Sequence, residues 1–139
     1  MKNKACYLLF TFIIFGAALA QAEDVPEVIK RGFKVYNAAG PKAAIEYWLK
    51  GSSLDGLSQA NILSQGEDYF GSYQGYDLFK SIALGPKSRL YLITINFQKG
   101  ALFAKFLTYE PEGRAVIVQM FHFNAEVDQV WPPNMVYVE

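Results

Sequence analysis

Between Tyr73 and Asn124, four apolar runs alternate with three compact turn signals, and this pattern restricts the possible folds more than any other feature of the chain. The turn signals are Gly85-Pro86-Lys87-Ser88, Lys99-Gly100 and Glu110-Pro111-Glu112-Gly113. Glycine supplies the positive φ that tight hairpins need, and proline presets φ early in a turn. The runs between them are rich in the β-branched and aromatic residues that suit strands. The sequence therefore predicts a four-stranded antiparallel meander.

If these loops close simply, Phe97 faces Leu102, Leu84 faces Arg89 and Tyr109 faces Arg114. The two-residue period of a strand then assigns every side chain to one face of the sheet. The face that we expect to form the core carries Tyr76, Leu78, Lys80, Ile82, Tyr91, Ile93, Ile95, Phe97, Leu102, Ala104, Phe106, Ile117, Gln119, Phe121 and Phe123. The opposite face is too apolar for a surface exposed to water, so we expect something to cover part of it.

Three amphipathic helices are expected before the sheet. The first begins at Asp24-Val25-Pro26-Glu27, which supplies a capping acid, a proline and a glutamate three residues after the cap. The second runs from Pro41 to Lys50, and the third follows Ser53 or Asp55. The predicted fold class is α+β, with three N-terminal helices packed on one face of a bent, four-stranded antiparallel meander. Residues 126–139 should form an irregular tail in which Val130 and Trp131 could dock on the body.

The beginning of the chain has the three parts of a secretory signal peptide. Lys2 and Lys4 precede an uncharged run, and the run is followed by Ala20-Gln21-Ala22. We expect cleavage after Ala22, export to the periplasm or the medium, and no stable membrane insertion afterwards. An uncleaved anchor is the alternative, although the run is shorter than the roughly 20 residues that span a bilayer comfortably.

Removal of residues 1–22 takes away two lysines and the only cysteine, Cys6, and leaves 11 basic and 13 acidic residues. This balance argues against nucleic acid as a partner, because nucleic-acid binding requires a clustered basic face. No motif points to a cofactor or a metal. A mature chain of about 117 residues can bury one core without disulfides. Residues 23–125 are therefore expected to form a single domain.

Several short phrases carry a resemblance to known proteins. They are Gly40-Pro41-Lys42-Ala43-Ala44, Trp48-Leu49-Lys50-Gly51-Ser52, Tyr69-Phe70-Gly71, Gly75-Tyr76, Ser88-Arg89 and Lys99-Gly100-Ala101-Leu102-Phe103-Ala104. They resemble small secreted bacterial proteins, and the arrangement resembles the cone-shaped fold of the ketosteroid-isomerase and nuclear-transport-factor-two-like superfamily. Enzymes on that fold place a carboxylate or a histidine inside the cone, whereas the face expected to point inward here has no Asp, Glu or His.

The inner face suggests a ligand pocket. Lys80 and Gln119 are the polar residues that we expect there, and Ala104 would leave room beside Gln119 for a ligand group. Trp48, Tyr91 and Phe106 could line the mouth of this pocket. The structural alternative is that Lys80 extends to water, that Gln119 bonds to backbone or a buried water, and that the aromatic residues are simply core.

Three classes of function remain open. The first is an exported small-ligand-binding or accessory module with an apolar cavity between helices and sheet. The second is an isomerase, cyclase or hydrolase that uses Tyr91, Lys80 or His122, the only histidine. The third is a structural or partner-binding protein that uses the outer sheet face. We expect that face to form a homodimer interface. The interface residues would be Leu90, Leu92, Phe103, Lys105, Leu107, Val116, Val118 and Met120.

Overall fold

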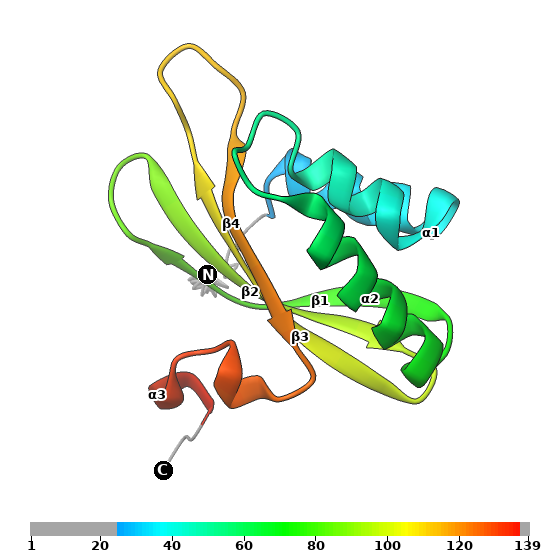
Figure 1. Cartoon of the computed structure of the whole chain (residues 1–139). Helices are drawn as coiled ribbons and strands as arrows, with labels where there is room; N and C mark the ends of the chain where they lie inside the picture. Colours follow the sequence, from blue (N-terminus) through cyan, green and yellow to red (C-terminus); the bar gives the residue numbers. More distant parts are fainter. Residues whose placement is uncertain (1–24, 137–139) are drawn as a thin grey trace, which may run out of the picture.

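The computed structural model describes residues 25–136 (Figure 1). The expected signal peptide, residues 1–22, lies outside the described residues. The described chain is α+β, as the sequence predicts. Its elements are, in order, α1 (Glu27–Trp48), α2 (Gly56–Phe70), β1 (Tyr73–Ala83), β2 (Ser88–Phe97), β3 (Gly100–Tyr109), β4 (Ile117–Asn124), the single 3₁₀ turn η1 (Val127–Gln129) and α3 (Pro133–Val136).

The helices before the sheet differ from the expectation of three, because the first two are one kinked helix. Gly40 has a φ of 85° and a ψ of −177°, so the helix is interrupted there, and Pro41 restarts it at once without a connecting loop. A positive φ of this kind favours glycine, and proline is well tolerated in the first turn of a helix. The expected third helix is α2, which Asp55 caps by accepting a hydrogen bond from the Leu57 amide at 3.0 Å.

The four-stranded meander is confirmed, with antiparallel neighbours in the order β1-β2-β3-β4. The β2–β3 hairpin pairs Phe97 with Gly100, whereas the sequence pattern suggested that Phe97 pairs with Leu102. This difference moves the register by two residues, and an even shift keeps every side chain on its predicted face. The residues between Tyr91 and Phe106 that were predicted to point into the core therefore do so.

Two β-bulges overturn the predicted faces of other residues. In β1 the extra residue is Phe79, so Lys80 pairs with Leu92, whose side chain lies on the outer face. In β4 the extra residue is Gln119, which is exposed. A bulge adds one residue to one strand only and so exchanges the faces beyond it. The expectations that Lys80 and Gln119 point inward are wrong for this reason.

The same bulge in β4 moves Val118 into the main core. Val118 has 0% of its surface exposed and packs among the inner-face residues, so its predicted place on the outer face is also wrong. Phe121 and Phe123, which lie after the bulge, keep their predicted inward positions and are 5% and 4% exposed. The bulge therefore leaves the polar side chain of Gln119 exposed to water and places the apolar side chain of Val118 in the core.

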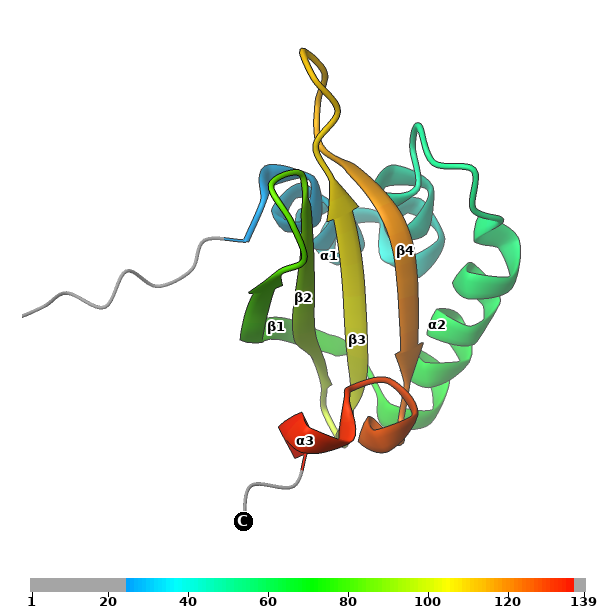
Figure 2. The ribbon, with the colours of Figure 1, turned by 90° about the vertical axis from the view of Figure 1, so that its left-hand side faces the viewer.

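Helices α1 and α2 cover the inner face of the sheet, and the C-terminal segment lies on the opposite side (Figures 1 and 2). The main core between helices and sheet includes Phe33, Trp48, Ile95, Phe106 and Phe121. Trp48 lies 5.2 Å from Phe106 and 5.3 Å from Phe121 between ring centroids. Such separations are typical of favourable aromatic packing.

Gly32 makes the close packing within α1 possible. The Trp48 indole lies directly against the backbone at Gly32, where a Cβ atom would overlap Trp48 Nε1 and Cδ1. Trp48 Nε1 donates a hydrogen bond to the Ile29 carbonyl at 3.2 Å, although that part of the helix precedes the kink. The kink at Gly40 therefore lets the two halves of α1 pack on each other, and the absence of a side chain at residue 32 sets how closely they approach.

Candidate functional site

The structure brings together only part of the expected inner pocket. Trp48, Ala104 and Phe106 are all 0% exposed and lie in the main core. Phe106 and Phe121 are 4.4 Å apart between ring centroids, and Phe33 contacts both Trp48 and Phe106 edge to face. These rings pack against one another in the same core as Ala104. Lys80 and Gln119 do not join them.

The three candidate catalytic side chains do not lie close together. Tyr91 is 6% exposed on the inner face, where it belongs to the main core. His122 pairs with Lys105 on the outer face, and Lys80 is exposed opposite Leu92. The sheet therefore separates Tyr91 from the two basic side chains. A shared proton transfer requires groups within hydrogen-bond reach of the same atom, which this placement does not provide.

A small polar cluster that sequence reasoning missed lies at one end of the inner face. Arg89 Nη1 donates a hydrogen bond to Ser81 Oγ at 2.7 Å, and Thr108 Oγ1 donates one to the Arg89 carbonyl at 3.2 Å. Ser81 and Thr108 are 7% and 4% exposed. Tyr91, Arg89 and Thr108 contribute to the wall of a hollow of about 260 Å³ beneath Pro26. The bulge at Phe79 turns Ser81 inward, so this cluster could not be found from a simple strand period.

A larger hollow of about 630 Å³ lies between α1 and the beginning of β1, and we call it the α1–β1 groove. Its wall on α1 consists of Lys30, Phe33, Lys34 and Asn37, and its wall on β1 consists of residues 73–76. The four helix residues follow the spacing i, i+3, i+4, i+7, which places them on one face of a helix. The volume is in the range of ordinary small-molecule sites.

The floor of the α1–β1 groove is aromatic. Phe33 stacks on Tyr76 with ring centroids 3.9 Å apart and planes 13° apart, and it lies parallel to Tyr73 at 6.3 Å. Tyr73 also contacts Tyr36 at 4.4 Å. Phe33 is 2% exposed, so the more exposed tyrosines present the aromatic surface to the groove. Lys30 and Lys34, from the facing helix, line the same hollow and bring two positively charged side chains to it.

Hydrogen bonding behind the groove holds its aromatic wall in place. Tyr36 donates its hydroxyl hydrogen to Glu67 Oε2 at 2.9 Å and so connects α1 to α2. Burial and this hydrogen bond raise the pKa of Tyr36 well above its ordinary value. Burial likewise raises the pKa of Tyr73, with a smaller contribution from the neighbouring Tyr76. Both phenols therefore stay neutral at physiological pH.

Gly75 shapes the strand wall of the groove. Its φ is 134°, a backbone conformation that residues with side chains rarely adopt. The register of β1 against β2 shifts between Tyr73 and Gly75, so Gln74 is an extra residue at this point. Because β1 is an edge strand, its other side has no neighbouring strand within residues 25–136. The irregular backbone opens the groove at that edge.

The expected dimer residues have three different environments. Leu90, Leu92 and Phe103 pack in a second apolar cluster with the C-terminal segment. Lys105, Leu107 and Met120 are half-buried in the outer parts of β3 and β4. Val118 lies in the main core, and Val116 precedes β4 in the β3–β4 connection. The C-terminal segment therefore covers the centre of the face that we expected a second copy to cover.

Within residues 25–136, no helix is long and apolar enough to cross a membrane. No group of three or more His, Cys, Asp or Glu side chains in this part of the chain could hold a metal ion. In comparisons with known proteins, no family model, curated protein or solved structure matches the chain.

Proposed function

We propose that this chain is an exported module that binds a small ligand in the α1–β1 groove, and that the ligand combines a flat apolar part with an anionic group. The single observation that carries the proposal is that Lys30 and Lys34 line the same hollow of about 630 Å³ as the aromatic rings of Phe33, Tyr73 and Tyr76. The site therefore lies beside the helix–sheet core and not inside it.

The chemistry of the walls supports this ligand class. Tyr73 and Tyr76 offer flat rings on which a planar apolar group can stack. Ammonium groups act as point charges for carboxylate, sulfonate or phosphate groups. Asn37 and Gln74 add amide groups that can donate or accept hydrogen bonds in the same hollow. The flat stacking surface and the positive charge are both supplied by residues of α1 and β1.

The binding proposal is tested with anilinonaphthalene sulfonate, a fluorescent probe that has both a flat apolar part and an anionic group. We expect saturable binding that weakens as salt is added, because exposed charges are screened. The double variant Lys30→Gln with Lys34→Gln should bind about tenfold more weakly, which corresponds to about 1.4 kcal/mol. Lys99→Gln is the matched control, because Lys99 is exposed in the β2–β3 hairpin and does not line the groove.

Equal affinity of the double variant and the parent protein would overturn the assignment of the groove. Gln74→Trp gives an independent check, since a bulky ring at the strand wall should obstruct the groove without removing any charge. The circular dichroism of each variant should match that of the parent protein, so that loss of binding cannot be a loss of folding. Export is tested separately by the intact mass of the protein recovered outside the cytoplasm, which should begin at Glu23.

The cone-like superfamily remains a proposal that rests on the quoted phrases and on the order of helices and strands. A catalytic version of that fold finds no support in the placement of Tyr91, Lys80 and His122. The binding proposal does not depend on this relationship, because it uses only residues that line the groove.

A further inference from the structure

The C-terminal segment covers part of the outer face of the sheet. We call residues 125–136 the C-terminal strap; it contains η1 and α3 and lies across the outer face (Figure 2). The strap's Val130 and Trp131 are 2% and 7% exposed and pack with Leu92, which is 0% exposed. Half-buried residues complete this second cluster. They are Ile82, Leu90, Phe103, Val127, Met135 and Val136.

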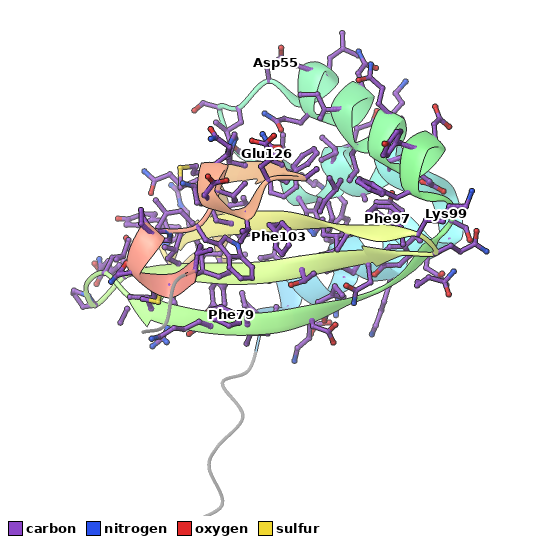
Figure 3. All side chains as sticks on the ribbon, turned by 90° about the horizontal axis from the view of Figure 1, so that it is seen from below. Asp55, Phe79, Phe97, Lys99, Phe103 and Glu126 are labelled. Carbon is purple, nitrogen blue, oxygen red and sulfur yellow. The ribbon has the colours of Figure 1, made fainter. Side chains whose placement is uncertain are left out.

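Trp131 is the anchor of the strap. Its ring stacks on Phe79 at 4.7 Å with planes 16° apart and meets Phe103 edge to face at 5.2 Å. Its Nε1 donates a hydrogen bond to the Ala104 carbonyl of β3 at 3.0 Å. Phe79 and Phe103 lie on the side of the sheet where the strap runs, whereas Phe97 lies on the side of α2 (Figure 3).

Side chains, and not backbone pairing, hold the strap on the sheet. Within residues 25–136, the backbone hydrogen bonds recorded for the strap stay inside it, from Trp131 N to the Val127 carbonyl at 2.8 Å and from Met135 N to the Pro132 carbonyl at 2.8 Å. The strap therefore satisfies its backbone hydrogen bonds within itself, and it can leave the sheet without breaking a backbone hydrogen bond between strands. Ala125 and Glu126, which join it to β4, are both exposed and can act as the hinge.

The surface around the strap is also apolar. Phe79 and Leu84, from β1 and the turn that follows it, are 52% and 58% exposed, although large apolar side chains are costly to leave in water. Leu107 and Met120 pair with each other across β3 and β4 and are half-buried beyond the strap. After removal of residues 1–22 the chain keeps 11 basic and 13 acidic residues, a near balance, so two copies do not repel each other strongly.

We propose that the outer face is the docking site for the strap of a second copy, so that two chains form a homodimer by exchanging straps. Every contact of Trp131 and Val130 that one chain makes within itself can be made in the same way between two chains, which is what makes exchange of an identical element a low-cost route to a dimer. Bringing two outer faces together also shelters the exposed rim at Phe79 and Leu84. This surface is separate from the α1–β1 groove and does not depend on ligand binding.

The first test asks whether the strap docks from a separate molecule. The receptor is the full chain with Trp131→Ala, and the probe is a synthetic peptide of residues 125–139. Trp131 is the only tryptophan of that peptide, and Trp48 in the receptor is fully buried, so a blue shift in emission on titration reports docking of the peptide. The control peptide carries Val130→Asp, because Val130 is 2% exposed in the docked strap.

We expect the native peptide to saturate and the control peptide to bind at least tenfold more weakly. Equal titrations, or no shift at all, would overturn the proposal. If the Trp131→Ala chain fails to fold, the full chain with Trp131→Phe serves as the receptor, because it removes less apolar surface and still leaves the peptide with the only tryptophan at residue 131. A receptor that also carries Phe79→Ala should lose affinity for the native peptide, since it lacks the ring on which Trp131 stacks.

The second test measures exchange in the unmodified full chain. The protein is incubated at high concentration near its thermal midpoint, cooled, and analysed by light scattering for molar mass. We expect a dimer that persists on dilution, and a monomer for the Trp131→Ala chain treated in the same way. A monomer at every concentration would overturn exchange, and so would a dimer that forms equally well without Trp131.

Discussion

The contact between Gly32 and Trp48 gives the sharpest test of how α1 packs. In Gly32→Ala, the new Cβ would lie 2.5 Å from Trp48 Cε2 and would overlap Nε1 and Cδ1. Both residues are buried, and Trp48 is 0% exposed, so the indole must move within a packed core. Overpacking of this kind costs about 1 to 3 kcal/mol.

Movement of the indole has a second cost. It would weaken the hydrogen bond from Trp48 Nε1 to the Ile29 carbonyl, and a buried polar group without its partner costs about 1 to 3 kcal/mol. Alanine gains about 1 kcal/mol over glycine in a helix, which offsets part of the loss. We therefore expect Gly32→Ala to lower the free energy of unfolding by about 1 to 5 kcal/mol, measured by urea denaturation with circular dichroism.

Gly85→Ala is the matched control, because no atom lies within 4 Å of a Cβ placed at Gly85 and its φ is not in the positive range. We expect that change to stay within about 0.5 kcal/mol of the parent protein. Trp48→Phe should reduce the cost of Gly32→Ala in a double-mutant cycle, since the smaller ring leaves room for a methyl group. If Gly32→Ala proves as stable as Gly85→Ala, the indole does not lie against the backbone at Gly32 and the reasoning is refuted.

Three further predictions concern Ala104 in the core, Gly40 at the helix kink and the buried phenol of Tyr36. Ala104→Phe should destabilise the protein by about 1 to 3 kcal/mol or prevent folding, because Ala104 is 0% exposed among packed rings; an unchanged thermal midpoint would instead indicate the cavity expected from the sequence. Gly40→Ala should lower the free energy of unfolding by about 1 to 3 kcal/mol in denaturant, since a φ of 85° with a ψ of −177° is a conformation that essentially only glycine adopts; a neutral effect would mean that the kink can relax. Stability should fall above about pH 10, by up to about 1.4 kcal/mol per pH unit from Tyr36, because the unfolded chain loses a phenolic proton that Tyr36, with its raised pKa, retains in the fold. Tyr36→Phe should reduce the fall of the free energy of unfolding with pH, measured by urea titrations at a series of pH values. If the fall is unchanged in Tyr36→Phe, Tyr36 is not its source.

Local chemistry was enough to predict the sheet. The turn signals between the strands and the runs of β-branched and aromatic residues act over a few neighbours, so they indicate the number and order of strands without knowledge of the rest of the chain. The inward positions of Ile93, Ile95 and Phe106 followed from the two-residue period, and the even register shift at Phe97 left them unchanged. The docking of Val130 and Trp131 was also anticipated, because two large apolar side chains in a short tail need a surface to cover.

Only the tertiary structure determined where the two-residue alternation of side chains along the strands is interrupted. The bulges at Phe79 and Gln119 place an extra residue in one strand, and their positions depend on which side chains the facing surface can accept. Packing favoured Val118 over Gln119 in the core and Trp131 as the partner of Phe79, and neither preference can be read from local spacing. For the same reason the sequence pattern placed the candidate site in the core, whereas the α1–β1 groove is formed by residues of α1 and of the irregular edge strand β1 that only the tertiary structure brings together.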